Sequence, residues 1–425
     1  MKILHKYYWK FFIAALSLWM IMAGWMLYQM IPSHIYIKEG EEAKLQFAVP
    51  VTEKVVDAGE GVYVFDTLNK DSLTEAIHIT GNSYVSTQDT GTFTIMCHLF
   101  GLFPVKEVQA TIVEEQQLLP GGMTAGIYVQ TKGVLVIGTG VVQAMTGEEV
   151  EPALNIVKSG DYITAVNGIP VEEKEQMIEQ IEEAEGNKLV FTLVRDGKSL
   201  DVSLEPVYTD QKDYKVGIWV RDDIAGIGTI SYVTEDMEYA ILGHAINDMD
   251  SGAMVEIDNG TLYASEISDI VRGEIGSPGE MIGTISYSRD NVLGDIERNT
   301  DSGAFGFLNE LPEELKTETG NDWLEPAFKQ EIKMGAAQII SDVSGVREFY
   351  DIEIQALDYK EMHQNKGILF QVTDERLLSK TGGIIQGMSG SSIVQDGKII
   401  GAVTHVLVND PTKGYGIFIE NMLEK

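Results

Sequence analysis

Ser389 lies near the end of the sequence in the stretch Gly-Met-Ser-Gly-Ser, a setting that favours a nucleophile. A serine hydroxyl attacks a carbonyl group only when a neighbouring base removes its proton. Gly387 and Gly390 flank the serine, and glycine lets the backbone approach a substrate closely. We therefore predict an oxyanion hole made by the N–H groups of Gly387 and Ser389. Because glycine–serine turns are common, this stretch needs support from the rest of the chain.

The base that this serine requires is predicted to be His244. It lies in EYAILGHAINDMDSG, at a glycine turn that follows an apolar strand. His405 lies within an apolar strand and is predicted to be structural, whereas His363, in KEMHQNKG, is predicted to lie in a solvated loop. The sequence lacks H-x-x-x-H and C-x-x-C spacings, so we predict neither a metal nor a cofactor.

Composition narrows the classes of partner. The chain has 425 residues and a net charge of −34, which argues against nucleic acid because phosphate backbones require clustered cations. This length predicts two or three domains, and 44% hydrophobic residues favour folded ones. The one cysteine, Cys97, lies in an apolar run and is predicted to be a buried structural thiol.

The N-terminal segment, residues 1–32, is predicted to be a cytoplasmic stub and a transmembrane signal anchor. Phe11 to Ile31 form 21 residues without a charge, about the length that a helix needs to cross a bilayer. Lys2, Lys6 and Lys10 precede it and place the N-terminus in the cytoplasm. A cleaved signal peptide is the alternative, but this stretch exceeds the usual apolar region and no clear cleavage motif follows.

Two β-rich regions are predicted to follow. Residues 33–117 contain short alternating runs typical of a small β domain. Residues 118–208 contain strands, a helix from Glu172 to Glu185, and a hairpin around Asp196-Gly197, an order that resembles a PDZ domain. Such domains bind a peptide as an added strand, and a fold used only for packing is the alternative. The groove is predicted along this helix and along Gly133, Val134, Leu135 and Val136.

Residues 209–425 contain about ten predicted strands, which is typical of a barrel architecture. The pattern G-x-S-G-[GS] around Ser389 resembles the serine loop of chymotrypsin-like peptidases, and a predicted hairpin follows it directly, as in that fold. We therefore expect a mainly β chain. Its parts would be a membrane anchor, a small β domain, a PDZ domain and a C-terminal chymotrypsin-like double β-barrel.

Together these stretches resemble the S55 family of sporulation serine peptidases over nearly the whole chain. GHAINDMDSG and TGGIIQGMSGSSIVQDGKIIGAVTHV carry the most specific likeness. The resemblance implies that His244 and Ser389 are catalytic and that Asp374 is the orienting acid. Chymotrypsin-like folds place that carboxylate far upstream of the serine, so Asp290 is an alternative. Asp248 and Asp250 lie close to His244 in sequence, and both could cap the turn there.

The resemblance also implies a biological role. Such proteins are membrane-tethered, cut themselves to release a soluble form, and act between forespore and mother cell. Their protein substrate is a membrane-bound inhibitor of an intramembrane protease that activates the late mother-cell sigma factor. The PDZ domain is expected to bind a peptide of the target or of the enzyme itself. A non-catalytic PDZ scaffold of the cell envelope and a general envelope quality-control protease are the alternatives.

Overall fold

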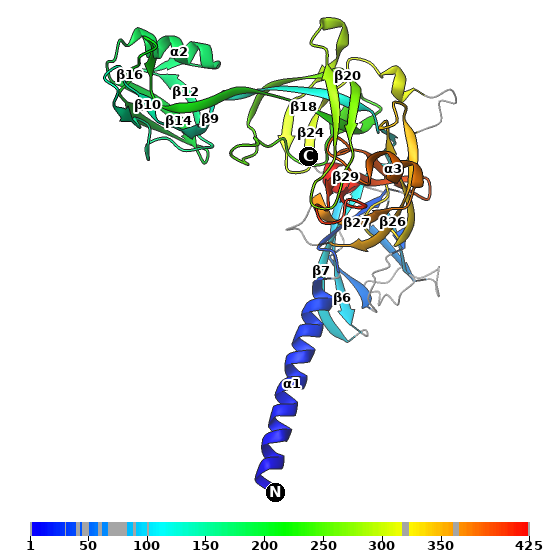
Figure 1. Cartoon of the computed structure of the whole chain (residues 1–425). Coiled ribbons are helices and arrows are strands. Elements are labelled where there is room, and N and C mark those ends of the chain that lie inside the picture. Colours follow the sequence, from blue (N-terminus) through cyan, green and yellow to red (C-terminus); the bar gives the residue numbers. More distant parts are fainter. Residues whose placement is uncertain are drawn as a thin grey trace.

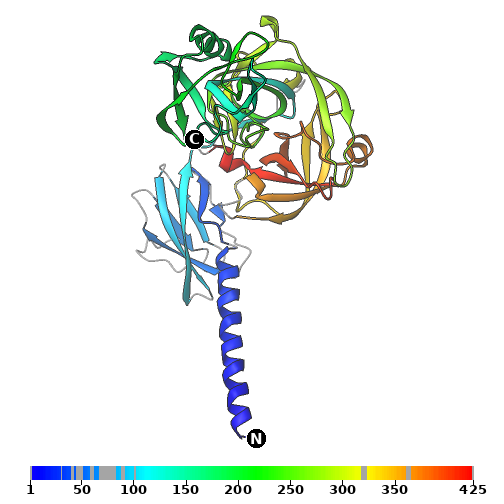
Figure 2. The same cartoon turned by 60° about the vertical axis from the view of Figure 1, so that its left-hand side comes forward.

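The computed structural model describes residues 2–29, 31–39, 43–44, 51–57, 62–66, 83–87, 91–99, 102–316, 323–359 and 365–423. Strands dominate these residues, and the elements group into a helix, a small β domain, two barrels and an outlying unit (Figures 1 and 2). The predicted mainly β architecture is confirmed.

The first helix, α1 (Lys2–Gln29), projects away from the rest of the molecule (Figure 1). Its segment Phe11–Gln29 is apolar and long enough to cross a membrane. Among the helices in the described residues, it is the one with this length and composition. Lys106 fixes the end of this helix. Its ammonium group donates to the Ile31 carbonyl at 2.6 Å and lies 4.7 Å from the ring centroid of Tyr28.

The small β domain follows α1 directly (Figure 2). One sheet has the strand order β1-β7-β6-β3, with β1 and β7 parallel, and the second has the order β2-β5-β4. The core of the first sheet includes Ile35, Phe93 and Cys97, which confirms the predicted buried thiol. The strands are β1 (His34–Lys38), β2 (Ala43–Lys44), β3 (Val51–Asp57), β4 (Val62–Asp66), β5 (Ser83–Thr87), β6 (Gly91–Leu99) and β7 (Phe103–Val113).

Strand β1 also attaches this domain to the C-terminal part of the chain. Lys38 is buried, and its ammonium group lies 2.7 Å from the Glu325 carboxylate. The Tyr36 ring packs against Phe328 with 5.6 Å between centroids. A buried lysine requires a partner for its charge. The ion pair therefore holds β1 to the C-terminal region, while backbone pairing with β7 holds it to its own sheet.

Two six-stranded barrels carry the C-terminal region. In the first, β9, β18, β19, β24, β22 and β20 form a ring that a bridge between Gly294 and Leu308 closes. Its core includes Ile127, Tyr239 and Leu262. The elements are β8 (Leu118–Pro120), β9 (Thr124–Thr139), β18 (Ile218–Thr234), β19 (Glu238–Ile241), β20 (Ile257–Val271), β21 (Glu280–Ile285), η1 (Arg289–Asn291), β22 (Val292–Asp295), β23 (Arg298–Thr300), β24 (Gly303–Phe307) and η2 (Glu313–Leu315).

The second barrel is closed in the order β25-β26-β27-β30-β29-β28. Tyr350, Phe370 and Phe418 are among the residues that fill its core. Interiors of small barrels are filled by inward-facing side chains, which leaves no channel. The predicted double β-barrel is confirmed. The elements are β25 (Gly335–Ser341), β26 (Glu348–Leu357), β27 (Ile368–Val372), α3 (Glu375–Thr381), β28 (Ser392–Gln395), β29 (Lys398–Val406), β30 (Lys413–Phe418) and α4 (Ile419–Leu423).

A separate core defines the PDZ-like unit, residues 133–222. Met177 and Ile181, one helical turn apart, bury the inner face of α2 (Lys174–Glu183). Asp196 and Gly197 both have positive φ, so the predicted tight hairpin joins β14 and β15. The other elements are β10 (Val142–Gln143), β11 (Glu149–Val150), β12 (Tyr162–Val166), β13 (Ile169–Pro170), β14 (Leu189–Arg195), β15 (Lys198–Leu204), β16 (Val207–Tyr208) and β17 (Tyr214–Lys215).

The PDZ-like unit is an insertion in the first barrel. Strands β9 and β18 pair along most of their length, and each contributes to both cores. Within β9, Ala125 to Val129 pack in the barrel, whereas Val134 and Val136 pack in the PDZ-like unit. Figure 1 shows the unit standing apart at the end of these two strands. The cores therefore do not coincide with the boundaries predicted at residues 118 and 208.

The structure corrects the predicted peptide groove. Leu135 pairs with Tyr162 of β12 on one side and with Arg221 of β18 on the other. Gly133, Val134, Leu135 and Val136 are all buried. A peptide adds to a sheet only where a strand has an open edge, and this strand has none. The chain's own β18 lies where the ligand was predicted, and its Asp222 carboxylate accepts from the Lys174 N–H of α2 at 2.8 Å.

Candidate active site

The serine-bearing loop, residues 387–391, precedes β28 of the second barrel. Gly387 and Gly390 have φ of +95° and +101°, a region that side chains rarely adopt. A β-carbon on Gly390 would lie 1.8 Å from the Thr229 carbonyl oxygen. Only glycine therefore fits at position 390, which is the physical reason for the pattern around Ser389.

Thr229 fastens this loop to the first barrel. Its N–H donates to the Ser389 carbonyl at 3.0 Å, and its hydroxyl donates to the Gly387 carbonyl at 2.7 Å. Thr229 lies in β18, so the two barrels meet at the serine. The carbonyl groups of Gly387 and Ser389 therefore both accept hydrogen bonds from Thr229.

The N–H groups of Gly387 and Ser389 have no hydrogen-bond acceptor within the part of the chain that the structure describes. Gly387 and Ser389 are both half-buried, so these two donors are accessible to a bound substrate. The neighbouring N–H groups all donate to backbone carbonyls, and they belong to Gln386, Met388, Gly390 and Ser391. The arrangement fits an oxyanion hole, whose donors are satisfied only by the developing charge.

His244 lies in the loop that follows β19 of the first barrel. Its Nδ1 is 2.8 Å from the Ala245 carbonyl oxygen. Because a carbonyl only accepts, Nδ1 carries the proton of the neutral ring, which leaves Nε2 as the basic nitrogen. Burial lowers the pKa of His244, and the bond to Ala245 partly opposes this. The imidazole is therefore neutral at pH 7 and able to accept a proton.

Strand β29 contacts both the serine loop and the histidine loop. The Ser389 hydroxyl donates to the Thr404 carbonyl at 2.8 Å. Next to the histidine, a β-carbon on Gly243 would lie 3.0 Å from the Thr404 methyl group. The His244 and His405 ring centroids are 5.4 Å apart. In this resting arrangement the serine bonds to the backbone, and catalytic hydrogen bonds often form only once substrate is bound.

His405 is the residue of β29 that faces His244. Its Nδ1 is buried and has no hydrogen-bond partner among the described residues. Burial first, then the proximity of His244 and Lys366, lowers the pKa of His405 to about 4. His405 is thus a second neutral imidazole beside His244. His363 lies outside the described residues.

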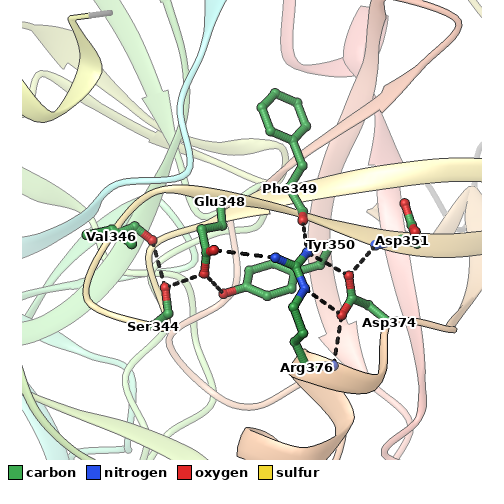
Figure 3. Close-up of polar contacts among 8 residues, drawn as sticks. All are labelled: Ser344, Val346, Glu348, Phe349, Tyr350, Asp351, Asp374 and Arg376. Carbon is green, nitrogen blue, oxygen red and sulfur yellow. Dashed lines mark hydrogen bonds and ion pairs between the residues drawn. The ribbon is translucent and has the colours of Figure 1, made fainter.

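Figure 3 shows the surroundings of Asp374, which lies at the start of α3 in the second barrel. Its carboxylate caps α3 by accepting from the Arg376 N–H at 2.9 Å, and it pairs with the Arg376 guanidinium at 2.8 Å. It also accepts from the Asp351 N–H at 3.3 Å. These bonds, that of the guanidinium above all, lower the pKa of Asp374 to about 2. Across the described residues, no contact joins Asp374 to His244.

The alternative carboxylates do not orient His244 either. Asp290 is exposed in η1. Asp248 is buried, pairs with Arg221 at 2.6 Å, and closes its turn by accepting from the Ser251 N–H at 2.8 Å. The capping role considered for Asp248 is thus what the structure shows. Over the ranges described, the Ala245 carbonyl is the group that bonds to the ring Nδ1.

Some residues that build the site carry no sequence signal. Asn299 holds the histidine loop, because its side chain accepts from the Ile246 N–H at 2.8 Å and donates to the carbonyls of Ile246 and Val255 at 2.9 Å each. Arg221 and Thr229 also lack a motif. Each acts on a loop that is distant in sequence, so only the fold reveals them. No group of three His, Cys, Asp or Glu side chains is placed to hold a metal within the described ranges.

Comparisons with known proteins give one family match and a structural likeness. Residues 212–423 match the model of a family described as SpoIVB peptidase S55. Among solved structures, the chain is similar to the PDZ domain of the SdrC-like protein from Listeria monocytogenes, with 18% identity and a TM-score of 0.18. That likeness covers 22% of this chain and 90% of the other. No curated protein matches the chain.

Proposed function

The chain belongs to the SpoIVB peptidase S55 family and is a serine endopeptidase, and from this premise we propose that Ser389 is its nucleophile and His244 its general base. The observation that carries the proposal is the pair of N–H groups, on Gly387 and Ser389, that have no acceptor among the described residues. They lie beside a serine bonded to Thr404 of β29, and the half-buried His244 ring packs against the next residue of that strand, His405. A nucleophile, a base and an oxyanion hole are the parts that acyl transfer requires.

In the acylation step, Ser389 Oγ forms a bond to the carbonyl carbon of the substrate and its proton moves to His244 Nε2. The carbonyl oxygen becomes an oxyanion and accepts from the N–H groups of Gly387 and Ser389. Collapse of this intermediate breaks the carbon–nitrogen bond, and His244 gives its proton to the leaving amine. An ester between Ser389 and the N-terminal part of the substrate remains.

Deacylation repeats these steps with water as the nucleophile. His244 accepts a proton from the water molecule, the new oxygen–carbon bond forms, and the ester bond to Ser389 breaks. The serine recovers its proton from the imidazolium. The charge of that imidazolium is offset by the Ala245 carbonyl, which already accepts from Nδ1 at 2.8 Å.

For Asp374 we propose a positioning role in place of the predicted contact with the imidazole. The carboxylate caps α3, and α3 leads through Thr381 into the segment that carries the serine. Both Asp374 oxygens are engaged by Arg376 and by the Asp351 N–H. Its carboxylate therefore supports the helix that precedes the serine loop.

The biological role that we propose follows the family. The protein is a peptidase of sporulation, tethered by α1 with its bulk in the space between forespore and mother cell. It cuts a membrane-bound inhibitor of an intramembrane protease and so triggers activation of the late mother-cell sigma factor. It also cuts itself to give a soluble form. The apolar length of Phe11–Gln29 supports the tether.

Ser389→Ala tests the catalytic proposal. We expect the full chain in detergent to react with a fluorophosphonate probe at Ser389 and to cleave casein, and we expect the variant to lose on the order of 10⁶ in kcat. Ser391→Ala is the matched control, because that buried hydroxyl lies in the same loop and has no partner among the described residues. Equal labelling of wild type and Ser389→Ala would refute the assignment, and a wild type that never labels would favour a non-catalytic scaffold.

A further inference from the structure

Strand β18 runs from the PDZ-like unit into the first barrel. Near its start, Ile218 and Val220 pack against the core of the PDZ-like unit. Near its end, Ile230 and Val233 lie in the core of the barrel. Between these ends, Thr229 holds the serine loop. One strand therefore connects the outlying unit with the active site.

Arg221 lies at the PDZ-like end of this strand and reaches the loop of the catalytic base. Its guanidinium bonds the Asp248 carboxylate at 2.6 Å and the Asp250 carboxylate at 3.0 Å. The Asp248 side chain is fully buried. Buried carboxylates require a cation or several hydrogen bonds, and Arg221 supplies the only cation that contacts this one within the described residues.

Asp248 in turn fixes the loop that carries His244. Its second oxygen accepts from the N–H groups of Asp250 and Ser251, at 3.2 and 2.8 Å, which closes a turn shortly after the histidine. The ion pair and this turn thus bear on the same short segment. Loss of the guanidinium would leave a buried charge uncompensated and would force the loop to move.

The backbone of Arg221 is positioned by the PDZ-like unit. It pairs with Leu135, and Leu135 pairs on its other side with Tyr162 in β12. The neighbouring Asp222 is held by Lys174 at the start of α2, with 2.7 Å between ammonium and carboxylate. The pairing of β18 within the PDZ-like unit therefore fixes the position of the Arg221 guanidinium.

We infer that Arg221 is a positioning residue for the catalytic base, and that through it the PDZ-like unit controls the placement of His244. The inference rests on the proposed function, because it requires His244 to be the base. The expected effect is a displacement of the His244 ring when the ion pair is lost. A misplacement of about 1 Å in a catalytic group costs on the order of 10²-fold in rate.

Arg221→Met in the full chain tests this inference, with Arg221→Lys as the conservative variant. We expect Arg221→Met to lower kcat for casein cleavage by about 10- to 100-fold with little change in KM, and to slow fluorophosphonate labelling of Ser389 to the same extent. Arg221→Lys restores the cation without the two-pronged geometry and should recover part of the rate.

Arg195→Met is the matched control. Arg195 pairs at 2.6 Å with Asp161, another buried carboxylate, but this pair lies wholly inside the PDZ-like unit and touches no catalytic loop. Both Met variants should lower the unfolding temperature, whereas only Arg221→Met should lower kcat at a temperature where both are folded. If both variants keep wild-type kcat, or both lose it equally, the inference is overturned. An inactive, unlabelled wild type would instead defeat the proposed function.

Discussion

The two barrels hold the loops that carry Ser389 and His244 in different ways. In the second barrel the serine loop is fixed mainly through its own backbone, as the Ser389 carbonyl accepts from the Thr229 N–H and the Gly390 N–H donates to Val403 at 2.7 Å. In the first barrel the histidine loop is held by side chains from elsewhere, those of Asn299 and Arg221. Backbone fixing demands glycine and leaves a motif, whereas side-chain fixing leaves none.

Because of this difference, the two loops depend on different contacts for their position. The serine loop depends on close contact between the barrels, through the bonds of Thr229 with Gly387 and Ser389. The histidine loop depends on an ion pair that starts in the PDZ-like unit. Regulation through the inserted unit would therefore act on the base and spare the oxyanion hole.

Among the variants that test this difference between the loops, the largest effect is expected from breaking the backbone arrangement of the serine loop. Gly390→Ala would place a β-carbon 1.8 Å from the Thr229 carbonyl oxygen, at a φ of +101°. Displacement of the oxyanion donors should lower kcat by about 10²–10³-fold. Gly397→Ala is the control, because Gly397 also has a positive φ, of +78°, but faces open space. Wild-type labelling of Gly390→Ala by a fluorophosphonate would contradict the backbone mechanism.

A smaller effect is expected at the carboxylate of the second barrel. Asp374→Asn keeps a capping oxygen but removes the ion pair with Arg376, so it should lower the free energy of unfolding by about 1–2 kcal/mol. We expect kcat to change less than about 10-fold, since an orienting carboxylate would cost about 10⁴. Steady-state kinetics and chemical denaturation measure both quantities, and a loss near 10⁴ without destabilisation would restore Asp374 to the triad.

The same variant has a pH signature. The folded-state pKa of Asp374 is about 2, below its ordinary 3.8, so the ionised carboxylate stabilises the folded state above pH 4. This stability is lost as the pH falls from about 4 towards 2. The stabilities of wild type and Asp374→Asn should therefore converge over that range, with Arg376→Gln behaving as the variant does.

The smallest effect concerns the acid limb of the rate profile. Burial lowers the pKa of His244 below 6.5, and only the neutral ring can accept the serine proton. The labelling rate should thus fall with a midpoint below pH 6.5. An ionised carboxylate against the ring would raise that pKa. A midpoint above 6.5 would therefore show that a carboxylate orients the base when the enzyme is active.

Local patterns carried much of the fold. The Asp196-Gly197 hairpin, the apolar face of α2 and the glycines around Ser389 depend on residues close in sequence, so their prediction required no knowledge of tertiary contacts. The assignment of barrels also followed from strand number and spacing. The serine loop could be predicted from the sequence because its geometry excludes side chains at position 390 and so requires glycine there.

Strand pairing between residues far apart in the sequence could not be predicted. Leu135 and Arg221 are paired across the whole inserted unit, and no pattern near Gly133 to Val136 indicates that this strand has a partner on each side. The peptide groove was therefore misplaced. The contacts of Asn299 with Ile246 and of Arg221 with Asp248 were equally hidden, because polar residues of these types are common on any surface.

The junction between α1 and the small β domain has a further consequence. Lys106 contacts the Tyr28 ring near the end of α1 and bonds to the Ile31 carbonyl, and strand β1 begins at His34. The described residues on both sides of this junction are therefore held firmly to the small β domain. The ion pair of Lys38 with Glu325 extends this rigidity to the second barrel. With α1 in a bilayer, the serine is held at one height above the lipid surface. We would then expect the distance of a scissile bond from the membrane, as well as its sequence, to decide whether it is cut.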